Sequence, residues 1–273
     1  MTPSPERLPP ELAEALSRVD LRRLGTPTLF FSSIGSTNDV AAALAAGGAR
    51  DGGVVIAETQ TAGRGRRGRV WFSPPGAGLY VSVVLAPSRA VRQPDRATAL
   101  LTLAAGVALA EAVERVTGLA PAIKWPNDLL VGKRKLAGIL AEGVASPTPT
   151  AGLQSVVLGY GLNVSAAAYP ADLSDRVTSL ESELGRRVDR ADLCAQSLAM
   201  LAARYDDLLD ARFDAILDAW RARAPGSRGL RVSWETPGGP QSGVTAGVDD
   251  VGALLVRVGE RTERIVAGEV SWA

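Results

Sequence analysis

Glycines and arginines alternate within one short stretch of this chain, Thr59–Trp71. The alternating residues are Gly63, Arg64, Gly65, Arg66, Arg67, Gly68 and Arg69. Glycine permits positive φ angles and a close approach of the backbone to a ligand. Arginine carries a permanent charge and planar donors that match phosphate and carboxylate. The stretch therefore predicts a mobile loop that closes over an anionic group, with phosphate as the favoured anion.

A basic, glycine-rich segment has a second interpretation, a disordered segment that binds nucleic acid. Two observations argue against it. The stretch lies between two apolar runs that read as strands, Val54–Glu58 and Gly78–Ala86. The chain also carries 30 Lys and Arg residues against 29 Asp and Glu residues, so its net charge of +1 gives no general attraction to nucleic acid or membranes. Any basic function must be local.

A second group of charged residues lies in Lys124–Asp128 and in the hairpin that follows. Pro126 and its two successors form a turn signal, and Gly132–Arg134 reads as the tip of a hairpin. Lys135 lies just beyond that tip, at the start of the strand Leu136–Val144. A lysine at such a position is ordinarily a solvated charge that blunts the edge of a sheet. Its position alone therefore assigns it no chemistry.

Polar residues precede a helix at Ser36–Asp39, before the apolar run Val40–Ala46 and the stop signal Gly47–Gly48. The structural interpretation is that these side chains cap the helix. The functional interpretation is that a helix N-terminus offers N–H and hydroxyl donors to a polar ligand. Farther along, the strand Ser155–Val164 carries glycines at alternate positions, Gly159 and Gly161. One of its faces would carry no bulky side chain, which suits a flat ligand.

The remaining pattern predicts the framework that positions these groups. We expect a short helix at Glu11–Arg23, a strand at Thr28–Ser33, a long buried helix at Asp95–Val116 ended by Gly118, a strand at Pro121–Trp125, a flexible turn at Ser146–Thr150, an irregular segment at 165–180 and helical periodicity over Val188–Arg223 with a break near Asp210. After residue 224 the chain changes to short alternating runs: Leu230–Trp234, Gly243–Val248, Gly252–Val258 and Arg264 to the end. These predict a small β-barrel, and hence two domains, 1–224 and 225–273.

Composition excludes several function classes. The chain has no histidine, which removes Ser-His-Asp and Cys-His catalysis and the commonest metal ligand. Its one cysteine, Cys194, excludes an internal disulfide framework and predicts a reducing cytoplasm. The N-terminus shows no signal-peptide core, and no apolar stretch is read as long enough to span a membrane. Any chemistry must come from lysine, arginine, carboxylates and the backbone.

From Thr28 onward, nearly the whole chain resembles the biotin protein ligase family. The resemblance rests on six motifs in the right order and spacing: Gly35–Asn38, Glu58–Arg69, Lys124–Asp128, Arg134–Leu140, Gly159–Asn163 and Gly268–Ser271. The family's fold implies an α+β chain, with a mixed sheet and helices packed on one side, similar to class II synthetases, followed by an SH3-like barrel. Its activity implies two steps: biotin and ATP give biotinyl-5′-adenylate, and biotin then passes to a lysine of a biotin carboxyl carrier protein. The attacking carboxylate is already ionised at neutral pH, so the first step needs cations rather than a base.

The resemblance also implies roles for individual residues. The catalytic residues would be Lys135, which bridges biotin and the α-phosphate, with Arg66, and with Asp128 orienting or deprotonating the incoming lysine. The residues that would bind biotin are Ser36, Thr37, Asn38, Gln60, Gly63, Arg64, Gly65, Arg66, Lys135 and Gly138. Those on the ATP side would be Arg66, Arg69, Trp71, Lys124, Asn127 and Asn163, with Trp71 stacking on adenine. Mg²⁺ would accompany ATP and be held mostly by phosphates, and we assign it no protein ligand.

Alternatives and partners complete the sequence-based expectations. Some members of the family carry an N-terminal helix-turn-helix, for which residues 1–25 are too short, so we expect no DNA binding. We expect no membrane association, and a homodimer is compatible with the sequence. The segment 165–180 has no aromatic residue except Tyr169, so an adenylate-binding loop there would pack differently from the family's. Lipoate–protein ligation and a nucleic-acid-binding module that uses the arginine loop are the competing functions.

Overall fold

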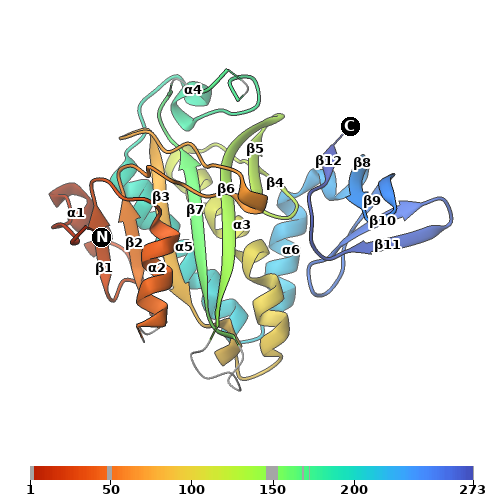
Figure 1. Cartoon of the computed structure of the whole chain (residues 1–273), viewed down its shortest axis with the longest axis horizontal. Coiled ribbons are helices and arrows are strands. Elements are labelled where there is room, and N and C mark those ends of the chain that lie inside the picture. The colour runs from red at the N-terminus through yellow and green to blue at the C-terminus, as the bar shows by residue number, and fades with distance from the viewer. Residues whose placement is uncertain (1–2, 48–50, 146–152, 168, 172, 273) are drawn as a thin grey trace.

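The computed structural model describes residues 3–47, 51–145, 153–167, 169–171 and 173–272 (Figure 1). Gly48 and the predicted turn at 146–150 lie outside the described residues. The larger sheet has seven strands in the order β1-β2-β3-β7-β6-β5-β4. The strands are β1 (Thr28–Phe31), β2 (Val54–Ala57), β3 (Gly78–Leu85), β4 (Ala122–Lys124), β5 (Asp128–Val131), β6 (Arg134–Ala145) and β7 (Leu153–Asn163). Only β1 and β2 pair in parallel, so the predicted mixed sheet is confirmed.

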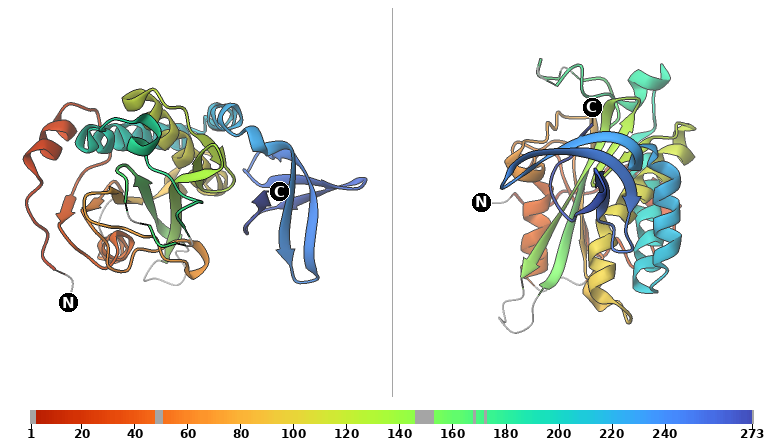
Figure 2. Two further views of the ribbon diagram at one scale, coloured as in Figure 1. Left: turned by 90° about the horizontal axis from the view of Figure 1, so that it is seen from above. Right: turned by 90° about the vertical axis from the view of Figure 1, so that its right-hand side faces the viewer.

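Helices cover both faces of this sheet. On one face lie α3 (Pro94–Thr117), α5 (Arg190–Leu209) and α6 (Phe213–Arg223), whereas α2 (Thr37–Ala46) lies on the other (Figure 2). The expectation of helices on one side is therefore wrong for α2. The strand β3 explains why, because Val83 joins the core cluster under α3 and Val84 joins a separate cluster under α2. Successive side chains of a strand point to opposite faces, so a continuous apolar run needs cover on both.

The helix α3 corrects a second expectation. It is 24 residues long, and its most apolar 18-residue window has a mean hydropathy of 1.5, enough by length and composition to cross a membrane. In the fold, 72% of that window is buried. The helix packs against β6, α5 and α6, so protein surrounds it on several sides and its polar stripe is narrow. Its apolar character is that of a core helix.

The helical boundaries match the sequence patterns at α3, which ends at Gly118 in the left-handed conformation, and at the break between α5 and α6. The N-terminal helix α1 (Pro10–Ser17) is shorter than predicted. It ends early because the chain turns instead: the Arg22 backbone has a φ of 52° and its N–H donates to the Asp20 carboxylate. Within the segment predicted to be irregular, the described residues form turns that lead into the short helix α4 (Leu180–Leu184).

A second, antiparallel sheet of five strands follows in the order β11-β10-β9-β8-β12. Its strands are β8 (Arg228–Thr236), β9 (Gly239–Val248), β10 (Leu254–Val258), β11 (Arg261–Ile265) and β12 (Ser271–Trp272). This arrangement is compatible with the SH3-like domain that the resemblance implies. The predicted domain boundary near 225 falls at the short 3-10 turn η4 (Pro225–Ser227), between α6 and β8. The division into 1–224 and 225–273 stays a prediction.

The small sheet is fixed against the core of the large one. The Trp125 indole N–H donates to the carbonyl of Gly252 at 2.9 Å. Gly252 has a φ of +82°, and a Cβ there would lie 3.0 and 3.1 Å from Leu103 and Leu100 of α3. Only glycine allows this contact without strain. The docking matters because the strand β12 and the turn before it carry residues that reach the cavity described next.

Candidate active site

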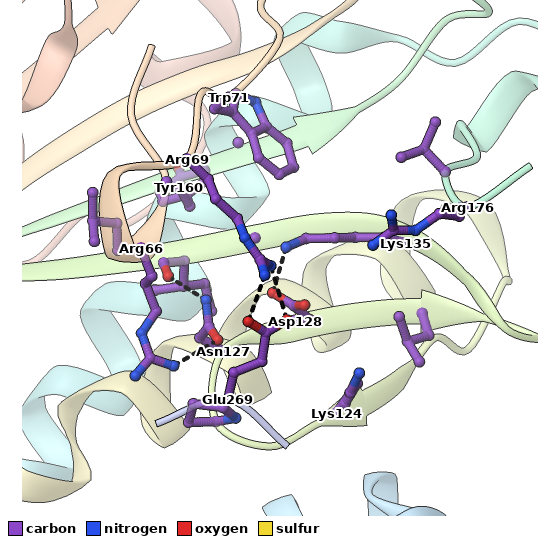
Figure 3. A pocket seen from close by; sticks show the side chains of 18 of the residues that line it. Arg66, Arg69, Trp71, Lys124, Asn127, Asp128, Lys135, Tyr160, Arg176 and Glu269 are labelled. Atoms are coloured by element: carbon purple, nitrogen blue, oxygen red, sulfur yellow. Dashed lines mark hydrogen bonds and ion pairs between the residues drawn. The ribbon is translucent and has the colours of Figure 1, made fainter. Parts of the chain in front are cut away.

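A single large cavity of about 1330 Å³ gathers the residues that the sequence singled out. It is lined by the arginine loop, the β5–β6 hairpin, the segment after β7 and the C-terminal turn (Figure 3). Sites for small ligands usually have ~300–1,000 Å³, so this cavity has room for two small molecules at once. Every predicted site residue except Gly63 lines it: Ser36, Thr37, Asn38, Gln60, Arg64, Gly65, Arg66, Arg69, Trp71, Lys124, Asn127, Asp128, Lys135, Gly138 and Asn163.

One end of the cavity consists of uncharged polar residues, and we call it the neutral end: Ser36, Thr37 and Asn38, which are buried, and Gln60, which is half-buried. Ser36 is the N-cap residue of α2, but its side chain makes no capping hydrogen bond. The Thr37 and Asn38 side chains turn instead toward Ser82 of β3, at 2.7 and 2.5 Å. The interpretation that these residues merely cap a helix is therefore wrong, because a strand hydroxyl offers them buried partners.

Gln60 connects the neutral end to the arginine loop. Its Oε1 accepts from the Thr37 backbone N–H at 2.9 Å, and its Nε2 donates to the Ser73 hydroxyl at 3.0 Å. The two arms of the loop then pair, because the Trp71 N–H donates to the Gly63 carbonyl at 2.9 Å. A Cβ at Gly63 would lie 2.5 Å from the Trp71 carbonyl oxygen. Gly63 thus allows the arms to approach each other, which accounts for its place outside the cavity lining.

Three arginines fasten the arginine loop to the rest of the fold. Arg64 pairs with Asp39 and Glu142, at 2.9 and 2.8 Å. Arg66 donates to the Asn127 side-chain oxygen at 3.0 Å, and burial lowers the pKa of its guanidinium from the ordinary value. Ion pairs and a hydrogen bond thus hold the loop in its position over the sheet. A charged ligand could compete for the same side chains.

Arg69 is the third of these arginines, and it makes a two-bond pair with Glu269 at 2.8 and 2.6 Å. Its hydrogen bonds lower the pKa of the Glu269 carboxyl. Arg69 was expected to hold phosphates, but its donors here meet a carboxylate from the C-terminal turn. Because a bidentate pair matches phosphate and carboxylate alike, a phosphate group would compete with Glu269 for the same guanidinium.

Lys135 and Asp128 face each other at the centre of the cavity, with Nζ and Oδ1 2.6 Å apart (Figure 3). The Lys135 side chain is 30% exposed, so it is not the freely solvated charge that a lysine near a hairpin tip ordinarily is. Its backbone is fixed on both sides, because its N–H donates to Arg176 and its carbonyl accepts from Thr178. Hydrogen bonds to the segment after β7 thus hold Lys135 in register.

Two further candidate residues lie near Lys135. Lys124 lies 5.2 Å from the ring centre of Trp272, and burial lowers the pKa of its ammonium group. Asn163 is buried, and its side-chain amide donates to the Thr178 carbonyl at 3.0 Å. Lys124 is therefore a desolvated cation at the cavity wall, whereas Asn163 holds the neighbouring segment in place.

The glycines of the central strands make room for side chains of the protein itself. A Cβ at Gly159 would overlap the Asn38 amide, and one at Gly161 would overlap the Trp71 indole. A Cβ at Gly138 would lie 2.9 Å from the same indole. In this structure Trp71 covers the flat face where a ligand was expected, and its Nε1 is buried with no hydrogen-bond partner among the described residues.

Comparisons with known proteins identify a family and relatives of this chain. Residues 30–163 match the model of the biotin/lipoate A/B protein ligase family. The biotin–[acetyl-CoA-carboxylase] ligase of Mycobacterium tuberculosis is 41% identical over 241 residues, 86% of this chain and 85% of that protein. The bifunctional ligase/repressor BirA of Bacillus subtilis is 34% identical over 266 residues, 96% of this chain and 79% of that protein. The chain belongs to the biotin protein ligase family.

Membership in the biotin protein ligase family extends to the fold. A biotin protein ligase from Aquifex aeolicus, solved with biotin and ATP, superposes with a TM-score of 0.76 at 26% identity, covering 90% of this chain and 98% of that one. The mixed-sheet fold inferred from the motifs is thereby confirmed, and the second sheet is compatible with an SH3-like domain.

Several residues that meet the site escaped the sequence analysis: Ser73, Ser82, Glu142, Arg176 and Trp272. Ser82 left a detectable signal, because it is the one serine in the apolar run Gly78–Ala86 and is fully buried. A buried hydroxyl needs a partner. Glu142 left none, since an acidic residue near the end of a long strand is normally a solvated charge.

Proposed function

We propose that the protein is a biotin–protein ligase. It joins biotin to ATP to form biotinyl-5′-AMP and pyrophosphate, then transfers biotin to one lysine of a biotin carboxyl carrier protein or domain. Family membership and the likeness to a ligase solved with biotin and ATP support this proposal. The observation that carries it is the Lys135–Asp128 pair, which lines the same cavity as the neutral end and the arginines of the loop.

The neutral end would hold the ureido ring of biotin. Thr37, Asn38 and Gln60 present amide and hydroxyl groups that are already hydrogen-bonded to one another and to Ser82. A site built this way binds an uncharged polar ring without buried unpaired charge, and it disfavours a ligand that leaves those groups unmatched. Biotin would then extend its carboxylate toward Lys135 and the arginine loop.

In the first step, a biotin carboxylate oxygen attacks the α-phosphorus of ATP. The bond from that phosphorus to the bridging oxygen breaks, and pyrophosphate leaves with the electron pair. Lys135 would leave Asp128 to bridge the carboxylate and the α-phosphate, and Arg66 would add a second donor. These cations offset the repulsion between two anions, and the bound geometry supplies the rest of the rate enhancement. Trp71 would move from the glycine face to stack on adenine, and Asn163 would lie on the nucleotide side.

In the second step, the amine of the acceptor lysine attacks the acyl carbon of biotinyl-AMP, and AMP leaves. The amine must first lose a proton, because a lysine is protonated at neutral pH. Once the Lys135 ammonium group has moved to the phosphate, Asp128 would be free to orient the ammonium group of the acceptor lysine or to accept its proton. Lys124 and Asn127 line the wall beside it.

Magnesium would be held chiefly by the phosphates of ATP. The described residues contain no group of three or more Cys, Asp or Glu side chains that could hold a metal ion. Asp128 and Glu269 are the carboxylates among the described lining residues, and each already pairs with a cation. That donor set fits an ion bound through one or two carboxylates and phosphate oxygens, which is the usual magnesium site. When bound, the ion neutralises phosphate charge.

The competing functions are not favoured by the comparisons. The family model covers both biotin and lipoate ligases, but the relatives reported above are biotin ligases or a ligase/repressor. The absence of DNA binding, a cytoplasmic location, the lack of membrane association and a homodimer stay predictions. A gel-filtration measurement and a salt series of oligonucleotide binding would address the oligomeric state and DNA directly.

The proposal is tested by supplying the purified protein with ATP, Mg²⁺, a carrier domain and either biotin or lipoate. We expect mass spectrometry to show biotin on one carrier lysine, with release of AMP and pyrophosphate, and no comparable product with lipoate. A carrier in which that lysine is replaced by arginine serves as the control. Equal labelling with lipoate, or no labelling with biotin, would contradict the proposal.

A further inference from the structure

Glu142 lies outside the cavity lining, yet it contacts two of the residues assigned to biotin. Its Oε2 accepts from the Asn38 side-chain amide at 2.6 Å and pairs with the Arg64 guanidinium at 2.8 Å. Glu142 comes from β6, whereas Asn38 belongs to α2 and Arg64 to the arginine loop. One carboxylate oxygen thus joins three elements, and its side chain remains 38% exposed.

This contact fixes which way the Asn38 amide faces. A carboxylate only accepts hydrogen bonds, so the amide NH₂ must face Glu142. The Asn38 oxygen must then face Ser82, and the Ser82 hydroxyl must donate to it at 2.5 Å. The oxygen and NH₂ ends of an amide have nearly the same shape and differ mainly in their hydrogen bonding. Without Glu142 the Asn38 amide could therefore turn over.

The same reasoning extends along the network. Three contacts involve hydroxyl groups: Ser82 with Asn38, Ser82 with Thr37, and Thr37 with Gln60 Oε1 at 3.1 Å. Each hydroxyl has one hydrogen, so two hydrogens serve three contacts. Because the orientation set by Glu142 requires the Ser82 hydrogen to point to the Asn38 oxygen, the Thr37 hydrogen is the one left for the other two contacts. It can point either to the Ser82 oxygen or to Gln60 Oε1. The oxygens of Asn38 and Gln60 are left with capacity to accept, and the neutral end is one donor short.

We propose that Glu142 is a positioning residue that sets the hydrogen-bond polarity of the neutral end. It holds Asn38 with its oxygen inward, which makes the neutral end an acceptor-rich site for a ring with N–H donors, and it ties Arg64 to the same point. The inference rests on the proposed function, since it concerns how that site selects biotin. Glu142 acts through Asn38 and touches no substrate.

The test measures biotin-dependent pyrophosphate release at saturating ATP, with biotin and with 2-iminobiotin, in which an imine nitrogen replaces the ureido oxygen. Glu142→Ala is expected to raise the KM for biotin about tenfold while kcat and the KM for ATP change less than about twofold, as expected for loss of one charge-assisted hydrogen bond. 2-iminobiotin carries N–H donors where biotin has its ureido oxygen, so an Asn38 amide that is free to turn its NH₂ inward should disfavour it, and the preference for biotin should widen. Glu142→Gln keeps an acceptor for Asn38 but not the charge for Arg64, so its effect should be smaller.

Asp39→Asn is the matched control, because among the described residues the Asp39 side chain pairs with Arg64 but makes no hydrogen bond to the Asn38 amide. We expect it to leave the preference between the two ligands unchanged. If Glu142→Ala fails to fold, Ser82→Ala frees the Asn38 oxygen for donors of the ligand and should shift the preference the opposite way, toward 2-iminobiotin. An unchanged KM and preference in these variants, or equal losses for biotin and ATP, would overturn the inference. A wild-type protein without biotin-dependent pyrophosphate release would instead overturn the proposed function.

Discussion

The two ends of the cavity differ in the charge and in the exposure of their side chains. At the neutral end, Thr37 and Asn38 are 3% and 6% exposed, and their partner Ser82 is fully buried. At the other end, which we call the cationic end, Arg69 is 62% exposed and Lys135 is 30% exposed. The first consists of hydrogen bonds between side chains on a helix and strands. The second consists of ion pairs on a loop, a hairpin and a C-terminal turn.

This difference matches what each end would have to do. Recognition of an uncharged ring needs groups that are already oriented, since buried polar atoms without partners are costly. Reaction between two anions needs cations that can leave one partner for another. The carboxylates Asp128 and Glu269 pair with Lys135 and Arg69, and in the proposed reaction phosphates would replace them. Positioning therefore comes from the buried end, and charge from the exposed end.

Replacing Lys135 should have the largest effect, because it removes a charge from the cationic end and leaves the neutral end unchanged. Lys135→Met keeps the stem against Gly138 and Trp71 but removes the charge. We expect adenylate formation, followed as pyrophosphate release, to fall by about 10²–10³-fold, as for loss of one donor to a developing charge. Arg115→Met, which removes an exposed charge outside the cavity lining, is the control. Activity within about twofold of wild type in Lys135→Met would remove the catalytic assignment.

Gly159→Ala tests the neutral end alone. The new Cβ would overlap the Asn38 amide, and overpacking typically costs about 1–3 kcal/mol. We expect the KM for biotin to rise about 10-fold to 100-fold, with the KM for ATP nearly unchanged. Gly238→Ala is the matched control, because a Cβ there meets only the Thr236 hydroxyl at 3.7 Å. Equal changes in both KM values would show that the ends are not separable.

Arg66 was assigned to both biotin and ATP, and it contacts Asn127 in the lining of the cavity. Arg66→Ala is expected to weaken biotin binding and adenylate retention together, each by about tenfold, which corresponds to ~1.4 kcal/mol. Calorimetry with biotin and the dissociation rate of the adenylate are the measurements. If only the affinity for ATP changed, the arginine loop would be a clamp for the nucleotide alone.

The smallest expected effect concerns the Arg69–Glu269 pair. The pKa of Glu269 is lowered in the folded protein, so the pair stabilises the fold above the ordinary glutamate pKa of about 4.3, and this contribution is lost as the pH falls through the lowered value. Both groups are well exposed, which limits the contribution to about 0.2–1 kcal/mol. Chemical denaturation of wild type and Glu269→Gln should therefore differ slightly at pH 7 and converge as the pH falls below the lowered pKa of Glu269. A difference that grows with acidification would contradict this sign.

The cationic end could be found from sequence because its residues are adjacent and of unusual type. The alternation of glycine and arginine in Thr59–Trp71 has few structural explanations, and Lys135 became significant only beside the other motifs. The strands around these motifs were also predictable from their apolar runs.

The neutral end was harder to predict because its partners are far apart in the chain. Ser82 lies 44 residues from Asn38, and Glu142 lies 104 residues from it. A polar residue at a helix start reads as a cap unless the strand packed against it is known. The cover of α2 on the second face of the sheet was missed for the same reason.

The most direct test of the account measures biotin binding and biotinyl-AMP formation in the same two proteins, wild type and Lys135→Met. Calorimetry should show that both bind biotin, with affinities within about tenfold, because the neutral end is intact. Mass spectrometry after incubation with ATP and Mg²⁺ should show biotinyl-AMP in wild type alone. Equal adenylate in both proteins, or none in wild type, would contradict the division of labour between the neutral end and the cationic end.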